Sequence, residues 1–298
     1  MSNQNIKIHF KNSVIKGDIH LDGSKSISNR ALIMKALSNG ANIELRHLST
    51  SKDTRLMTSL LQSNDDILDA GAAGTTFRFL TAYLAIQSKE VILTGSERMK
   101  QRPIGELVNT LNEMGARIEY MEKEGYPPLR FHPADLNSFK RKISIQSTIS
   151  SQYITALLMI GPSLPNGLEL TMIGEVISRP YIEMTLTMMH HFGIESSWVE
   201  DTITIEPQAY QSNDLFVEGD WSAASYYYSL AAIADEAELR LYGISSQSMQ
   251  GDAAIADISR LFNIESTYHP DQVVLKKRDL PLPKSIEWDF IKCRGDNI

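Results

Sequence analysis

The sequence predicts an α/β protein built from repeated strand–helix–strand–helix–strand–strand units. Two observations support this prediction. Four apolar segments open with small or hydroxyl residues and run into a strand-like stretch; they begin at Ser24, Ala73, Ile149 and Asp220. A second, amphipathic helix is expected 29 to 32 residues after each of these starts, near Asp53, Pro103, Pro180 and Asp252.

The elements of each unit follow from local chemistry. The first helices, such as SKSISNRALIMKAL and ISSQYITALLMIG, are apolar on all sides, which is typical of buried helices. The runs NIEL, EVILTG, LELTMIG and AELRLYG then predict strands. Pro103 and Pro180 suit the first turn of the second helices, and PIGELVNTLNEMG and PYIEMTLTMMHHFG both end on glycine, a common helix stop. ARIEYM and ESSWVE predict the strands that follow.

Composition limits the class of protein. The 298 residues, 42% hydrophobic and 22% charged, predict a soluble globular chain of two domains. A net charge of −7 argues against nucleic acid or an anionic membrane as the main partner. The single cysteine, Cys293, excludes an internal disulfide and fits a reducing compartment. The chain opens without an apolar leader and has no stretch of 18 apolar residues, so we expect a cytoplasmic protein.

The segment LDGSKSISNRALIMKAL, residues 21–37, predicts an anion site. Just behind Gly23 it carries Lys25, Ser26, Ser28 and Arg30. A helix N-terminus offers unpaired N–H groups and a partial positive charge, so it favours phosphate. The lysine and the arginine add two full charges, which suits a small, multiply charged anion.

The chain resembles the EPSP synthase (3-phosphoshikimate 1-carboxyvinyltransferase) family. The resemblance rests on these segments in family order: GSKSISNR at 23–30, AGT at 73–75, LTGSERMKQRPIG at 93–105, YPPLR at 126–130, SSQYITALLM at 150–159, SRPYI at 178–182, VEGDWSAASY at 217–226 and SMQGD at 248–252. It implies the enolpyruvyl transferase fold, an inside-out α/β barrel, with two similar domains of three units and substrates in the cleft between them.

The resemblance also implies a reaction, in which phosphoenolpyruvate gives its enolpyruvyl group to the 5-hydroxyl of shikimate 3-phosphate and phosphate leaves. Phosphates and carboxylates held close together need cations and helix N-termini to offset their repulsion. The reaction also needs a base for the hydroxyl and an acid for the enol carbon. It needs no metal and no organic cofactor. We expect a monomer that acts on these two small molecules.

On the shikimate 3-phosphate side, the resemblance implies seven residues: Lys25, Ser26, Arg30, Ser150, Ser151, Gln152 and Ser178. Arg30 would make a forked contact with the carboxylate, and the serines and Gln152 would hold the 3-phosphate and the ring. Tyr181 would pack near the ring. An alternative stays open, since ISS is also an ordinary helix N-cap.

On the phosphoenolpyruvate side, the resemblance implies Lys25, Gly74, Arg102 and Gln152. Lys25 would contact both substrates and is the candidate proton donor. Gly74 would let the backbone approach the ligand, and Arg102 would bind its phosphate or carboxylate. As an alternative, Arg102 belongs to an ordinary basic loop.

Two departures from the family pattern fall beside this predicted pocket. Ala72 stands where the family commonly has asparagine, and Phe79 stands where proline often follows the arginine. We therefore expect altered affinity for phosphoenolpyruvate or for analogues such as glyphosate, in either direction.

The resemblance further implies three units in residues 23–217 and one of an expected three in residues 1–22 with 218–298. A fifth unit would begin at IEWDFIKC. The family's general base lies in a proline–aspartate helix start that this sequence does not contain, and Asp296 is not assigned that role. We expect a C-terminally truncated chain, so two hypotheses remain: enolpyruvyl transfer, or a non-catalytic remnant that binds shikimate 3-phosphate. The related UDP-N-acetylglucosamine enolpyruvyl transferases are disfavoured. Their mobile-loop cysteine usually lies near the position of Arg98–Arg102, and Cys293 is nowhere near that position.

Overall fold

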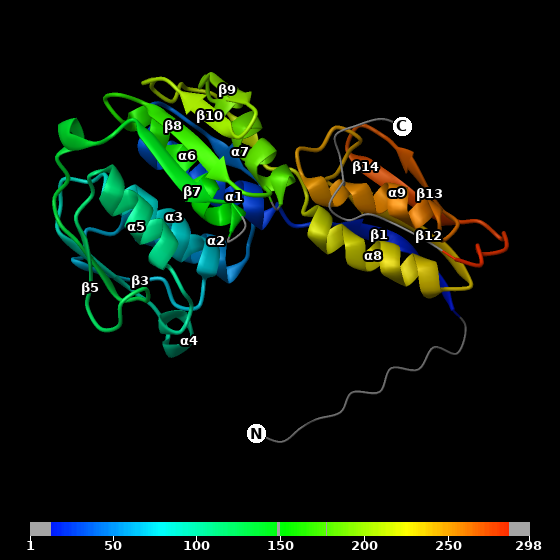
Figure 1. Cartoon of the computed structure of the whole chain (residues 1–298). Helices are drawn as coiled ribbons and strands as arrows, with labels where there is room; N and C mark the ends of the chain where they lie inside the picture. Colours follow the sequence, from blue (N-terminus) through cyan, green and yellow to red (C-terminus); the bar gives the residue numbers. More distant parts are fainter. Residues whose placement is uncertain (1–12, 148–149, 177, 286–298) are drawn as a thin grey trace. The chain divides into compact units, whose positions relative to one another are not determined.

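The computed structural model describes residues 13–147, 150–176 and 178–285, which fall into two compact units. The central unit is Gly23–Glu218, and the flanking unit combines the described residues before Gly23 with those after Glu218. Figure 1 shows both as mixtures of helices and strands, which confirms the predicted fold class.

Three helices that contact one another form the middle of the central unit: α1 (Lys25–Leu37), α3 (Gly74–Ala85) and α6 (Ser151–Ile160). They are the predicted first helices of three units, and each is buried over most of its surface. The amphipathic helices α2 (Lys52–Gln62), α5 (Gly105–Met114) and α7 (Arg179–His191) pack against them. Because the middle helices are apolar all round, they are stable only when neighbours cover them on every side.

The starts of the middle helices differ in their caps. The hydroxyl of Ser24 accepts the N–H of Ile27 at α1, and that of Ser150 accepts the N–H of Gln152 at α6. Helix α3 follows Ala73, whose side chain makes no capping hydrogen bond. The first N–H groups of α3 therefore lack a side-chain cap.

Two four-stranded sheets of the central unit share one topology. One has the order β3 (Ile67–Asp69), β4 (Val91–Thr94), β6 (Leu129–Phe131), β5 (Ile118–Tyr120). The other has the order β7 (Lys142–Gln146), β8 (Leu168–Ile173), β10 (Thr202–Ile205), β9 (Ser196–Val199). In both, the first pair is parallel and the other two pairs are antiparallel. The shared order confirms the predicted repeat.

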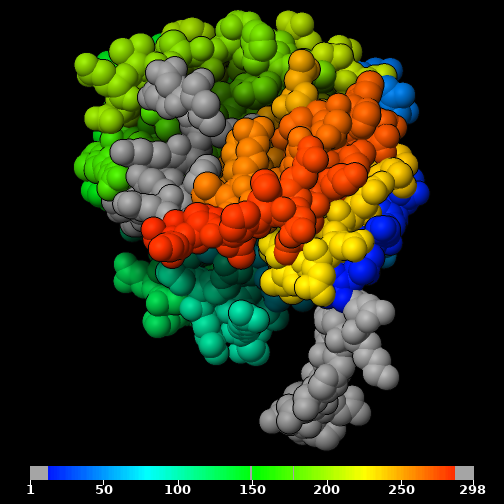
Figure 2. All heavy atoms as spheres, turned by 90° about the vertical axis from the view of Figure 1, so that its right-hand side faces the viewer, coloured from blue at the N-terminus to red at the C-terminus, as the bar shows by residue number. Residues whose placement is uncertain are grey.

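The flanking unit has the same sheet pattern, in the order β1 (Val14–His20), β12 (Glu236–Tyr242), β14 (Gln272–Lys277), β13 (Ile264–Tyr268). Helix α8 (Trp221–Ile233) covers it with fully buried Trp221 and Tyr228, next to the short α9 (Ile255–Arg260). The start of α8 is capped by the Asp220 carboxylate, which accepts the N–H of Ala223 at 3.0 Å. Tyr226 and Ile233 of α8, the helix coloured yellow in Figure 2, are exposed.

The first and fourth units exchange their leading strands. Elsewhere the strand before a first helix pairs in parallel with the strand after it, as β3 does with β4. By contrast β1, which precedes α1, pairs with β12, while β11 (Leu215–Phe216), which precedes α8, pairs with β2 (Leu45–Arg46). The chain thus passes twice between the flanking unit and the central unit.

Three details differ from the sequence expectation. The first unit has no closing hairpin, because only residues 63–66 separate α2 from β3 and two strands cannot fit in that length. Helix α5 begins at Gly105, so Pro103 lies before it rather than in its first turn. A short helix α4 (Glu97–Lys100), capped by Ser96, covers part of the segment for which an ordinary basic loop is the alternative interpretation. The expected fifth unit, Cys293 and Asp296 lie outside the described residues.

Candidate active site

The candidate residues of the central unit gather at the N-terminal ends of α1, α2, α3, α6 and α7. Lys25 is the first residue of α1, and its Nζ lies 3.5 Å from Oδ2 of Asp53 in the first turn of α2. The Asp53 carbonyl accepts a hydrogen bond of 3.1 Å from the Thr76 hydroxyl in α3. These contacts join the first turns of three helices.

Gly74 lies where two guanidinium groups converge. A Cβ built on Gly74 would lie 2.7 Å from Cζ of Arg102 and 2.7 Å from Nη1 of Arg78, so no other residue fits while both arginines keep their places. Burial, then the neighbouring charges of Arg78 and Arg98, lower the pKa of Arg102. The start of α3 is therefore a concentrated positive site.

Gln152 and Tyr153, at the start of α6, border this site. Nε2 of Gln152 donates to the hydroxyl of Thr75 at 3.3 Å, and the Gln152 Oε1 is buried without a hydrogen-bond partner among the described residues. The Tyr153 ring lies beneath the Arg78 guanidinium, 5.6 Å from Cζ to centroid, and its hydroxyl donates to the Pro103 carbonyl at 2.8 Å. The third unit thus contributes polar groups next to Gly74.

Arg30 occupies a separate, more deeply buried position. It is only 2% exposed, and its Nε donates to the Thr185 hydroxyl while its Nη1 donates to the Ser26 carbonyl, both at 2.8 Å. The rings of Phe79 and Tyr181 lie 5.4 and 5.8 Å from its Cζ. Burial lowers its pKa to about 10, which leaves it charged at neutral pH.

The four candidate serines have different surroundings. Ser150 is the N-cap of α6, which is the alternative that the sequence left open, and Ser151 is the first residue of that helix. Ser26 supplies its carbonyl to Arg30. Ser178 precedes α7 in the left-handed region, at φ 61°, and its side chain makes no capping hydrogen bond. A non-glycine residue at positive φ is uncommon and often belongs to a functional site.

Two relevant residues have no site role in the sequence analysis. Arg78 lies four residues after Gly74 and hence on the same face of α3, which is the signal that could identify it. Asp53 marks a helix start in the sequence, and the structure makes it the partner of Lys25. Phe79 is expected beside the phosphoenolpyruvate pocket, but its fully buried ring lies against Arg30, a candidate for shikimate 3-phosphate. Ala72, the other departure from the family pattern, is exposed just before α3.

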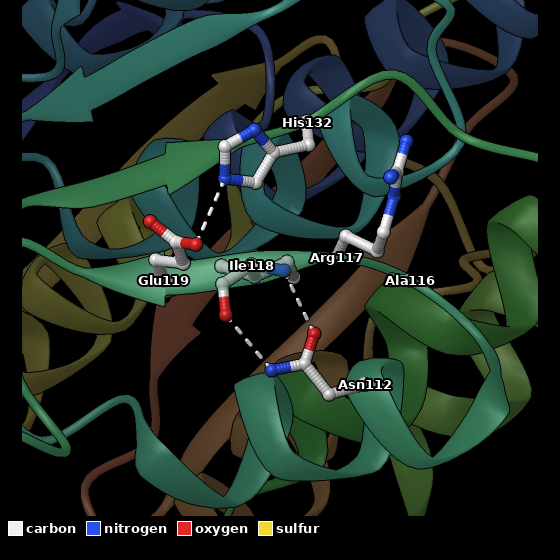
Figure 3. Close-up of a pocket in the computed structure, with 6 residues that line it drawn as sticks. All are labelled: Asn112, Ala116, Arg117, Ile118, Glu119 and His132. Carbon is white, nitrogen blue, oxygen red and sulfur yellow. Dashed lines mark hydrogen bonds and ion pairs between the residues drawn. The ribbon is translucent and has the colours of Figure 1, made fainter.

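A hollow of about 460 Å³ lies elsewhere on the central unit, over α5, β5 and the end of β6 (Figure 3). Asn112 exchanges two hydrogen bonds of 2.9 Å with the backbone of Ile118, and His132 Nε2 lies 3.1 Å from Glu119 but makes no hydrogen bond within the described residues. It contains none of the candidate residues. The described ranges also hold no cluster of histidine, cysteine or acidic residues suited to a metal ion.

Solved structures define the class of protein. The chain superposes with a TM-score of 0.67 on an EPSP synthase from Acinetobacter baumannii, at 18% identity, over 88% of this chain and 64% of that one. It superposes with a TM-score of 0.65 on the enolpyruvyl transferase NikO from Streptomyces tendae, at 14% identity, over 92% and 68% of the two chains. The fold is therefore that of the enolpyruvyl transferases.

Sequence comparison then defines the family. The model described as EPSP synthase (3-phosphoshikimate 1-carboxyvinyltransferase) matches residues 10–63 and 59–287. A 3-phosphoshikimate 1-carboxyvinyltransferase from Bacteroides fragilis is 45% identical over 280 residues, 94% of this chain and 67% of that protein. One from a Sulfurovum species is 37% identical over 305 residues, 93% and 70% of the two chains. The chain belongs to the EPSP synthase family and spans about two thirds of the length of these relatives.

Replacing Gly74 by alanine is expected to weaken binding of phosphoenolpyruvate at least tenfold without unfolding the chain. The added methyl group would push the Arg102 and Arg78 guanidinium groups out of their positions, and a charge-assisted hydrogen bond is worth about 1.5–3 kcal/mol. Titration calorimetry with phosphoenolpyruvate measures the effect. Gly17, where an added Cβ meets nothing, provides the matched control, and equal affinities of the two alanine variants would contradict the prediction.

None of the helices in the described ranges combines the length and apolarity that a membrane span requires.

Proposed function

We propose that this chain carries out or contributes to the transfer of the enolpyruvyl group of phosphoenolpyruvate to the 5-hydroxyl of shikimate 3-phosphate, with release of phosphate. The observation that carries the proposal is the convergence of Arg102 and Arg78 on the uncapped start of α3 at Gly74. An oxyanion bound there would be stabilised by two guanidinium groups and by the helix N-terminus. The names of the 45% and 37% identical relatives support the choice of substrates.

The two groups of residues suggest a division of roles. Gly74, Arg102 and Gln152 would bind phosphoenolpyruvate, while Ser26, Arg30, Ser150, Ser151 and Ser178 would bind shikimate 3-phosphate. Lys25 forms an ion pair with Asp53 of α2 and is only partly buried. It would contact both substrates and donate the proton to the enol carbon. For such a transfer between small phosphorylated metabolites we infer a cytoplasmic location.

A second candidate is a protein that binds shikimate 3-phosphate without turnover. It needs only the Arg30 position, where the guanidinium is already held by the Thr185 hydroxyl and the Ser26 carbonyl. Transfer to a UDP-sugar remains the less favoured alternative, because both of the quoted sequence relatives are named for 3-phosphoshikimate.

Phosphate release by the purified 298-residue chain distinguishes the two candidates. Release that requires shikimate 3-phosphate and phosphoenolpyruvate together would establish transfer. No release, with shikimate 3-phosphate still raising the unfolding temperature, would establish binding without turnover. If neither release nor protection is observed, both candidates are wrong.

Replacing Arg102 by alanine is expected to raise the apparent constant for phosphoenolpyruvate at least tenfold, because a hydrogen bond to a charged group contributes about 1.5–3 kcal/mol. The constant for shikimate 3-phosphate should change little, since Arg30 and not Arg102 belongs to that group. Both constants can be read from binding titrations. An unchanged phosphoenolpyruvate constant would remove Arg102 from the site.

A further inference from the structure

Arg78 is a buried cation that hydrogen bonds within the described residues do not fully satisfy. Arg78 is only 9% exposed, and its Nε is buried without a hydrogen-bond partner among the described residues. A buried charged donor without a partner is costly, so proteins rarely keep one unless something else binds it. Its Nη1 points toward the Gly74 backbone, 2.7 Å from the position of an added Cβ.

The surroundings of Arg78 add to this cost. Arg102 approaches the same backbone, and α3 contributes the partial positive charge of an uncapped N-terminus. The Asp53 carboxylate, whose charge acts on Arg102, already lies 3.5 Å from Lys25. The positive charges therefore repel one another in the ligand-free chain, and a bound anion would remove the repulsion.

A purely structural role for Arg78 explains less of its geometry. The guanidinium lies 5.6 Å from the centroid of the Tyr153 ring, and such a cation–π contact contributes about 0.5–2 kcal/mol. That contact uses the face of the guanidinium and leaves the buried Nε–H without an acceptor among the described residues. It accounts for the position of the side chain but not for the unpartnered Nε or for the direction of Nη1 toward Gly74.

We propose that Arg78 is a binding residue of the site and forms, with Arg102 and the start of α3, a two-arginine pocket for one tetrahedral or planar oxyanion. This proposal rests on the proposed function and deepens it: the group bound is the phosphate or the carboxylate of phosphoenolpyruvate. The pocket is optimised for its ligand at the expense of the ligand-free chain. Removal of Arg78 should therefore weaken anion binding and, at the same time, stabilise the chain without ligand.

The test uses the full chain with Arg78→Met, which keeps much of the side-chain volume and removes the charge. Titration calorimetry with inorganic phosphate, phosphoenolpyruvate and pyruvate measures binding, and thermal unfolding without ligand measures stability. We expect affinity for phosphoenolpyruvate to fall at least tenfold and the unfolding temperature to rise or stay unchanged. Arg78→Lys should recover part of the affinity. Arg117→Met, at an exposed arginine that donates to the Pro133 carbonyl, is the matched control and should alter neither.

The three ligands identify the group that is bound. Loss of inorganic phosphate binding in Arg78→Met places the phosphate in the pocket, and loss of pyruvate binding places the carboxylate there; either result supports the proposal. Unchanged affinities together with a lower unfolding temperature would show that Arg78 only supports the fold, and would overturn it. A wild-type chain that binds none of the three ligands would also overturn it. The proposed function is tested separately, by phosphate release and by protection against unfolding with shikimate 3-phosphate.

Discussion

Replacing Arg30 by alanine is expected to weaken binding of shikimate 3-phosphate by about 100-fold or more, because removing one partner of a buried, hydrogen-bonded charge pair costs about 2–5 kcal/mol. The guanidinium is held by the Thr185 hydroxyl and the Ser26 carbonyl and lies between the Phe79 and Tyr181 rings. It is therefore already oriented before the ligand arrives, and little side-chain entropy is lost on binding. Titration calorimetry with shikimate 3-phosphate measures the change.

Arg30→Met separates binding from stability. Burial lowers the pKa of Arg30 to about 10, because keeping the charge in the core costs free energy. Methionine removes this cost and fills most of the volume, so the lost hydrogen bonds are offset and the unfolding temperature should not fall. Alanine, in contrast, leaves a cavity and should lower it. A folded methionine variant that binds shikimate 3-phosphate normally would refute the assignment of Arg30.

Replacing Lys25 by alanine is expected to reduce the rate of phosphate release by about 10²–10⁴, the contribution of a positioned general acid. Affinity for phosphoenolpyruvate should fall at least tenfold as well, since the ammonium group would contact both substrates. The side chain is 45% exposed and its ion pair with Asp53 is 3.5 Å long, so stability should change by no more than about 0.5 kcal/mol. Release assays and binding titrations on the same preparation measure these effects.

Lys89→Ala is the matched control for Lys25. Lys89 also forms a partly exposed ion pair, 2.9 Å from Asp66, but it follows the C-terminal end of α3, whereas Gly74 lies at the N-terminal start of that helix. It should leave release and binding unchanged. Equal rates for the two alanine variants would show that Lys25 is a surface lysine and would remove it from the mechanism.

The local elements could be predicted because their signals are local. A hydroxyl residue or an aspartate before an apolar run predicts the helix start, and Ser24, Ser150 and Asp220 do cap α1, α6 and α8. The glycines after α5 and α7 mark their ends in the same way. Of the candidate residues, Lys25, Ser26 and Arg30 could be named from local charge at a helix start, whereas the others were implied only by the resemblance to the EPSP synthase family.

Contacts between segments far apart in the sequence could not be predicted in this way. Arg78 shows no unusual pattern in AGTTFR, and its meaning depends on Arg102, which reaches Gly74 from the segment between α4 and α5 of the same unit. Phe79 illustrates the opposite case: its place in the sequence suggested the phosphoenolpyruvate pocket, but the turn of α3 directs its ring to Arg30 on α1. Side chains one position apart on a helix point about 100° apart, so sequence neighbours often serve different sites.

The sequence by itself determined the repeat, the order of helices and strands within each unit, and the helix starts that carry Lys25, Gly74 and Gln152. Only the tertiary structure decided that β1 pairs with β12 and β11 with β2, and that Arg78 joins Arg102 at Gly74. The physical reason is that capping and periodicity act between residues a few positions apart. Strand partners and charge clusters, in contrast, are selected by the burial and electrostatics of segments that meet only after the chain has folded.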